Sequence, residues 1–242
     1  MCAEWNHSDT VNSGAVFYLI PPVDRTQKWE PVKFPSVEPT THRMRWIKLG
    51  EKEWGLVVVP LHGRGNKNGE GAPVKVLLYN PPMPLSDRKG DWKSEVVDES
   101  MHMTHNFALP IVEAGAKANS RKVVIGGREG LTLARQTPEG WRATHVIRNE
   151  VGANGSRGVG EIRGGHSADG AEFAAAVEPM HGNELIVYCN FKKELGSNPD
   201  RRVLTDKLTE GHALACGDLL GVKSDQIVVG WRGTPGKEGS TI

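Results

Sequence analysis

The sequence predicts an all-β fold, and three observations support this class. Short runs rich in Val, Ile, Leu and Tyr recur along the 242 residues, and no long window shows a helical period. The 29 Gly and 15 Pro are spread between these runs, as expected where turns are frequent. Two short polar markers also recur at nearly constant spacing. Repetition of this kind favours a β-propeller of four-stranded blades over a two-sheet sandwich.

The expected strands are apolar runs bounded by Gly, Pro, Asn or Asp. Several are apolar throughout, which is typical of strands buried on both faces. The clearest runs are Gly14–Ile20, Gly55–Pro60, Val74–Tyr79, Lys122–Gly126, Glu184–Tyr188 and Gln226–Gly230.

A first marker opens a strand in each of four units. Its copies are Thr41-His42-Arg43, Thr104-His105-Asn106, Gly160-Glu161-Ile162 and Gly211-His212-Ala213. A second marker, the polar residue that follows an apolar run, comes 20 to 23 residues later. It is Asn6, His62, Arg128, His181 and Arg232, at spacings of 56, 66, 53 and 51 residues. Two further strands follow the second marker in the clearest units, and four strands per unit match a propeller blade.

The phase of the markers predicts how the chain is divided. We expect a single propeller domain or propeller fragment with about four blade-equivalents. Its parts are an outer half-blade at 1–36, full blades at 37–100, 101–155 and 156–208, and an inner half-blade at 209–242. The ends either pair to close a small ring or belong to a larger propeller. Because the chain starts inside an expected strand, we favour part of a larger propeller.

Composition excludes several classes of partner. Lys and Arg number 30 and Asp and Glu 29, so the net charge of +1 argues against a nucleic-acid partner. No apolar run reaches the roughly 20 residues that cross a membrane. The start lacks the basic and apolar regions of a signal peptide, which makes the cytoplasm the default location. The three cysteines, Cys2, Cys189 and Cys216, show neither metal-ligand spacing nor a disulfide framework.

Both markers are expected on one face of a propeller, since the loop entering a first strand and the loop leaving a second strand share a face. The first markers then form an inner arc of His42, His105, Glu161 and His212. Three imidazoles and a carboxylate can hold a divalent metal ion with a position open for substrate. We therefore predict these four residues as metal ligands.

A purely structural role is the alternative to a functional one for each marker residue and for the tryptophans. A histidine that opens a repeated strand can be a hydrogen-bonding plug between blades, and His62 and His181 can simply form turns. Arg128 and Arg232 can pair with acidic neighbours. Tryptophans are expected in the core between blades, with sugar stacking as the alternative. The residues in question are Trp46, Trp54 and Trp231.

The fourth unit, residues 211–232, resembles the FG-GAP/VCBS type of propeller repeat. Asp218, Gly221 and Asp225 keep the frame of that repeat, as do Ile227 and Val228. The calcium loop of the family needs several acidic oxygens. Two of those places are Leu220 and Val222 in this chain, so calcium is not expected in these loops.

A narrower resemblance spans most of the chain. The segments around His42, His105, His181 and His212 resemble the propeller domain of aldos-2-ulose dehydratases and their bacterial relatives. The resemblance implies a sugar or another small polar ligand, a metal, and dehydration of a 2-keto sugar by proton abstraction and β-elimination.

The resemblance also implies roles for individual side chains, on top of the metal ligands. His105, His181 and Glu178 would transfer protons, and His62, Arg128 and Arg232 would bind the sugar or its oxyanion. The alternative is an FG-GAP/VCBS-like domain that binds a ligand or a partner without turnover. The oligomeric state is not predicted.

Overall fold

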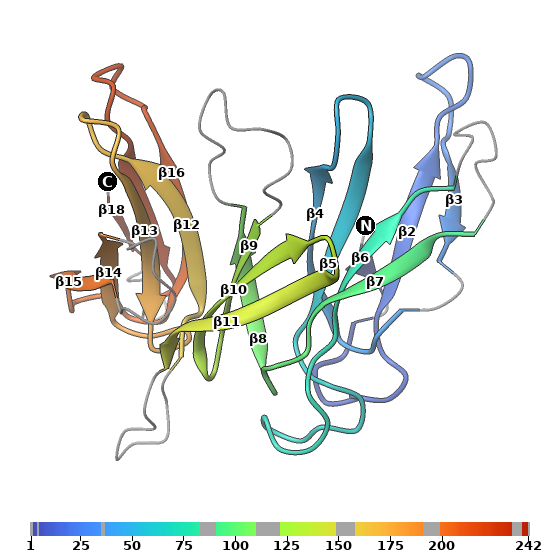
Figure 1. Cartoon of the computed structure of the whole chain (residues 1–242), viewed down its shortest axis with the longest axis horizontal. Helices are drawn as coiled ribbons and strands as arrows, with labels where there is room; N and C mark the ends of the chain where they lie inside the picture. The colour runs from blue at the N-terminus through green and yellow to red at the C-terminus, as the bar shows by residue number, and fades with distance from the viewer. Residues whose placement is uncertain are drawn as a thin grey trace. The chain divides into compact units, whose positions relative to one another are not determined.

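The computed structural model describes residues 2–3, 5–34, 37–82, 91–109, 122–148, 158–190, 199–233 and 239–241. These residues form strands, turns and loops, and none of them lies in a helix, so none lies in a helix able to cross a membrane. The chain divides into two compact units, Met1–Met103 and Thr104–Ile242, which are taken in turn below. Figure 1 shows the strands of both units.

The N-terminal unit contains two antiparallel sheets. The first has the order β1 (Cys2–Ala3), β2 (Ala15–Ile20) and β3 (Glu30–Lys33), and the second has the order β4 (Thr41–Lys48), β5 (Trp54–Pro60), β6 (Val76–Asn80) and β7 (Lys93–Asp98). In β5 every residue after Trp54 is buried, as the continuous apolar run predicts. The two sheets share a core of Val16, Phe34, Leu56, Val58 and Tyr79.

The C-terminal unit contains three antiparallel sheets, each with its strands in chain order. The first comprises β8 (Thr104–Ala108), β9 (Lys122–Gly127), β10 (Gly130–Thr137) and β11 (Gly140–Arg148). The second comprises β12 (Glu161–His166), β13 (Glu172–Glu178), β14 (Glu184–Cys189) and β15 (Asp200–Thr205). The third comprises β16 (Gly211–Gly217), β17 (Gln226–Trp231) and β18 (Gly239–Thr241).

The first strands of these three sheets lie side by side, with β12 between β8 and β16 (Figure 1). Neighbouring sheets therefore pack face to face and meet along their first strands. This is the arrangement of innermost strands in adjacent propeller blades.

Strand β13 shows how a sheet is buried on both faces. Ala174 and Ala176 pack into the core shared with the preceding sheet, which includes Leu131. Ala175 and Val177 point the other way, into the core shared with the following sheet. Successive side chains of a strand alternate between faces, so the unbroken apolar run contributes side chains to two separate cores. The small alanine side chains let the sheets approach closely.

The strand pattern agrees with the two predicted markers. The first marker opens β4, β8, β12 and β16, and the apolar runs before the second marker form β5, β9, β13 and β17. The prediction of an all-β fold with four-stranded antiparallel sheets is confirmed. The sheets at the two ends have three strands each, of which β1 and β18 are short.

The expectation that the tryptophans are core residues is wrong for two of three. Trp231 packs against the core between the last two sheets. Trp46 and Trp54 are about half exposed, at 47% and 48%. Both lie on the β4–β5 hairpin, outside the buried stretch of that sheet.

Candidate histidine site

The first marker coincides with a β-bulge wherever its second residue is a histidine. In β8 the ladder to β9 pairs Thr104 with Gly127 and then Asn106 with Gly126, so that His105 is skipped. His42 in β4 and His212 in β16 are skipped in the same way. A bulge redirects a side chain out of the regular alternation. The repeat therefore gives the three histidines equivalent backbone positions.

The first marker of β12 lacks the bulge. Glu161 pairs directly with Val177, and Ile162 pairs with Ala176. The Glu161 side chain consequently stays in the regular alternation and is 2% exposed.

Three histidine side chains of the C-terminal unit come together. They are His105 from β8, His181 from the β13–β14 turn and His212 from β16, and one ring nitrogen of each lies within 4.8 Å of the others. Nε2 of His181 is 2.8 Å from Nε2 of His105. The ring of His181 lies 4.5 Å from that of His212, centroid to centroid. Of the described residues, no other three His, Cys, Asp or Glu side chains gather so closely.

The turn that carries His181 is fixed by the starts of two neighbouring strands. The N–H of Gly160 donates to the carbonyl of Val177, and the N–H of Gly211 donates to the carbonyl of Gly182 at 2.9 Å. A Cβ on Gly160 would lie 3.1 Å from the backbone nitrogen of His181, so a glycine lets the turn approach this closely. His181 itself has a φ of 52°, in the left-handed region. The turn thus brings His181 between the strands that carry His105 and His212.

The other side of the His105 ring is anchored. Nδ1 lies 2.6 Å from the carbonyl oxygen of Gly160. A carbonyl only accepts hydrogen bonds, so Nδ1 carries the proton and, in the neutral ring, Nε2 keeps its lone pair. Nε2 is the atom that faces His181. The ring is therefore held in the tautomer that a metal ion or a proton donor needs at Nε2.

Glu161 lies on the anchored side of His105. Its Oε1 is 3.6 Å from Nδ1 of His105, and its Oε2 accepts a short hydrogen bond from the side-chain amide of Asn106. Arg163 is 3.7 Å from the same carboxylate. The carboxylate thus stands next to Nδ1 rather than in the group of three ring nitrogens. Sequence reasoning did not find Asn106 or Arg163: Asn106 reaches Glu161 from the neighbouring sheet, and Arg163 lies two residues beyond Glu161 on the same strand.

Glu178, at the end of β13, is buried and belongs to a second polar network that extends to the surface. Its carboxylate accepts a short hydrogen bond from the hydroxyl of Tyr188 and is 3.1 Å from Nη2 of Arg201. Arg201 also binds Glu184 at 2.5 Å. Burial raises the pKa of Glu178 above its usual value, although Tyr188 and Arg201 act in the opposite direction. Tyr188 and Arg201 were not predicted, because one sits in an apolar run and the other in an exposed strand.

Two of the predicted site residues belong to the N-terminal unit. His42 opens β4, and its ring is 5.9 Å from that of Trp5. His62 is buried at 8% exposure, and its backbone N–H donates to Oγ1 of Thr40 at 2.8 Å. Burial, together with His7, lowers the pKa of His62. The metal role of His42 and the sugar-binding role of His62 stay predictions.

The two predicted arginines lie in turns of the C-terminal unit. Arg128 is in the β9–β10 turn, and the backbone of Gly158 lies against it: a Cβ added at Gly158 would be 2.7 Å from its Cα. Arg232 follows β17, and its exposed guanidinium is 3.8 Å from the carboxylate of Glu210. An exposed pair at this distance contributes little to stability. Sugar binding by either arginine stays a prediction.

Repeated antiparallel sheets that meet along their first strands define the class of this protein, a β-propeller protein. Residues 13–191, about three quarters of the chain, match the family model described as aldos-2-ulose dehydratase, beta-propeller domain. The chain belongs to this family, as the narrower of the two sequence resemblances indicates. The broader FG-GAP/VCBS likeness is not part of this match. No curated protein shows significant similarity to the chain.

Proposed function

We propose that the chain acts on carbohydrate, and that His105, His181 and His212 hold a divalent metal ion for the dehydration of a 2-keto sugar. The observation that carries this proposal is the approach of three imidazole nitrogens to within 4.8 Å of one another. The family match supports the carbohydrate class of substrate.

The donor set fits a divalent metal. Neutral imidazoles are the commonest metal ligands in proteins, and three of them leave a fourth position for substrate in a catalytic zinc site. The hydrogen bond from Nδ1 of His105 to Gly160 fixes the ligand tautomer, a support that metal-binding histidines ordinarily have. His105 is almost fully buried while His181 is partly exposed, so the site has a closed side and an open side.

The ligand set differs from the one expected from the repeat. His181 takes the place of Glu161, whose carboxylate supports His105 from the Nδ1 side, and His42, which belongs to the N-terminal unit, is not one of the three. A ring nitrogen that binds a metal cannot also accept a proton. We therefore assign His105 and His181 to the metal and keep Glu178 for proton transfer.

When bound, a divalent ion would polarise the ketone of the sugar and stabilise negative charge on its oxygen. The protein's own part is the proton transfer. Glu178, three residues before His181, would take the proton from the carbon next to the ketone and return it to the departing β-hydroxyl. One C–H bond and one C–O bond break, one C=C bond forms, and water leaves. Burial, which raises the pKa of Glu178, suits a carboxyl group to this double role.

A second candidate function is a binding domain without turnover. The observation that favours it is the bond from His105 to Gly160, which ties β8 to the start of β12 as a structural plug would. In this case the histidines would stabilise the packing of neighbouring sheets and bind no metal.

Metal binding by single variants separates the two functions. We expect the chain, stripped with EDTA, to take up one Zn²⁺ in calorimetry, with affinity lowered at least 100-fold in His105→Ala, His181→Ala and His212→Ala. His166→Ala is the matched control, since His166 lies in the same unit beside Asp225 and outside the group of three. Zn²⁺ binding that is absent from the wild type, or unchanged in the three variants, would favour the binding domain.

Turnover is tested separately. The metal-loaded chain is incubated with a 2-keto hexose, and loss of water is followed by mass spectrometry. Glu178→Gln is expected to keep the metal and to lower the rate by about 10²–10⁴-fold, the usual contribution of a general acid–base group. Equal rates in Glu178→Gln and wild type would remove Glu178 from the mechanism.

A further inference from the structure

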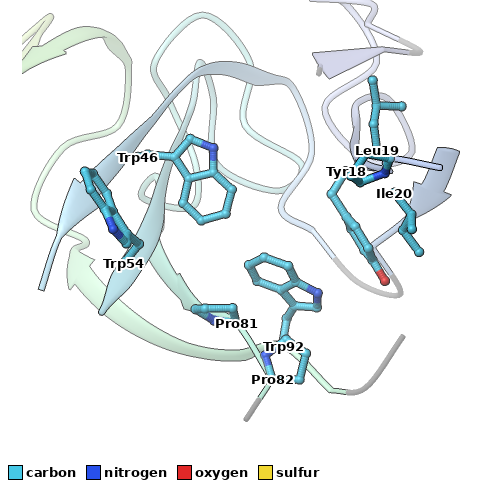
Figure 2. A pocket seen from close by; sticks show the side chains of 9 residues that line it. Tyr18, Leu19, Ile20, Trp46, Trp54, Pro81, Pro82 and Trp92 are labelled. Atoms are coloured by element: carbon cyan, nitrogen blue, oxygen red, sulfur yellow. The ribbon is translucent and has the colours of Figure 1, made fainter. Parts of the chain in front are cut away.

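The N-terminal unit has an aromatic pocket of about 370 Å³ that the proposed function does not use. Its walls include Tyr18 of β2, Trp46 of β4, Trp54 of β5 and Trp92, with Pro81 and Pro82 between them. Figure 2 shows these side chains around the pocket, with Tyr18 across the space from Trp46 and Trp54. A volume of this size lies within the range of about 300–1,000 Å³ that small-molecule sites have.

The back of the pocket is held in place by ring contacts. Trp92 lies 4.7 Å from Phe34, 5.4 Å from Tyr18 and 6.0 Å from Trp46, centroid to centroid. Phe34 in turn makes an edge contact with the buried Tyr79. The aromatic wall is thus continuous with the core of the N-terminal unit and is already ordered before any ligand binds.

The front of the pocket leaves aromatic surface open to solvent. Trp46 and Trp54 are about half exposed, although fully burying a large apolar side chain stabilises a protein by about 1.5–3 kcal/mol relative to leaving it exposed. The described residues that line the pocket include no charged side chain. The lining therefore offers flat apolar faces and the polar edges of Trp and Tyr, without a cation or an anion for a charged ligand.

We propose that this pocket is a second carbohydrate site, which binds an uncharged pyranose by stacking. One face of a pyranose carries several C–H groups, and their partial positive charge is attracted to the negative face of an indole. Its hydroxyl groups need donors and acceptors at the ring edges. Nε1 of Trp92 is such a donor: it is buried and has no hydrogen-bond partner in the part of the chain that the structure describes.

The pocket does not depend on the histidine site. It lies in the N-terminal unit, and the described residues that line it include no His, Cys, Asp or Glu, so its sugar binding should need neither metal nor turnover. The site would retain a sugar chain on the protein rather than act on it chemically.

The test is titration of the full chain, in buffer containing EDTA, with glucose, maltose and cellobiose. Calorimetry and the tryptophan fluorescence signal are both recorded. We expect binding of at least one of these sugars at millimolar concentration, weakened at least fivefold in Trp54→Ala and in Trp46→Ala. Trp29→Ala is the matched control, because Trp29 is also exposed in this unit but bonds to Arg25 and does not line the pocket.

Folding is checked by circular dichroism, and Trp54→Phe keeps the test valid if Trp54→Ala unfolds. This variant should retain part of the affinity, since it retains an aromatic face. His105→Ala should bind the sugars as the wild type does, which separates this proposal from the histidine site. Absence of binding at 50 mM of every sugar, or equal affinity in the Trp54 and Trp29 variants, would overturn the proposal. So would tryptophan-dependent binding of a proline-rich peptide without any sugar binding.

Discussion

Nδ1 of His105 donates a hydrogen bond to the carbonyl oxygen of Gly160 at 2.6 Å, across the boundary between two neighbouring sheets. The residue after Gly160 is Glu161, whose carboxylate lies 3.6 Å from the same nitrogen. The residues at the start of β12, Gly160 and Glu161, thereby orient His105 of β8, the first strand of the preceding sheet.

Glu161→Gln should weaken metal binding without removing a ligand. The change takes a negative charge away from the Nδ1 side of His105, and loss of a group that supports a ligand lowers metal affinity by about 10–100-fold. Calorimetry with Zn²⁺ measures the effect. Glu172→Gln is the control, because Glu172 is exposed at the far end of the same pair of strands. A ligand role for Glu161 itself would instead abolish binding.

The buried Glu178 should make stability depend on pH. Its folded-state pKa is raised above the usual 4.5, mainly by burial, so the folded state holds this proton more tightly than the unfolded state. The contribution of this group to stability is therefore present below pH 4.5 and declines as the pH rises from there through the raised pKa. Urea unfolding between pH 4 and 8 should show this decline in wild type and a flatter profile in Glu178→Gln. A profile equally steep in both proteins would contradict the raised pKa.

Calcium should have little effect on the β16–β17 loop. Asp218 already accepts hydrogen bonds from the backbone N–H groups of Val222 and Lys223, both at 2.9 Å. Leu220 and Val222, at two of the acidic places of the calcium loop, are exposed and supply no side-chain oxygen. Millimolar CaCl₂ should leave the melting temperature unchanged, whereas Asp218→Ala should lower the free energy of unfolding by about 1 kcal/mol. A rise of several degrees with calcium in wild type but not in Asp218→Ala would show a calcium site.

Ala176→Leu should destabilise the C-terminal unit. Ala176 is fully buried in the core between two sheets, and adding three carbon atoms there forces strain of about 1–3 kcal/mol. Ala171→Leu adds the same atoms at an exposed position just before β13 and should change stability by less than about 0.5 kcal/mol. Urea unfolding of both variants makes the comparison. Equal stability of the two would mean that the sheets are not closely packed at β13.

The sequence predicted the strands well because their cause is local. An apolar run such as Val57–Val59 has no polar side chain to face solvent, so it predicts a strand buried on both faces. The Gly and Pro that bound the run indicate turns. The repeat also placed His105 and His212 at equivalent strand starts, where the structure has them.

Contacts between sheets were harder to predict. The approach of His181 to His105 depends on a turn held by Gly160 and Gly211, from two other strands. Glu161 differs from the histidines because its ladder has no bulge, and the repeat alone did not predict where the strand pairing skips a residue. The exposure of Trp54 depends on where the β4–β5 hairpin ends relative to its neighbours.

The bulges at His42, His105 and His212 give the start of each of these first strands the same local design. Each adds one residue to one strand and leaves the rest of that sheet in register. A mutation at one marker therefore exchanges one side chain without shifting the strands beside it. Evolution of a new ligand set in this architecture can proceed one blade at a time, by single substitutions that the fold tolerates.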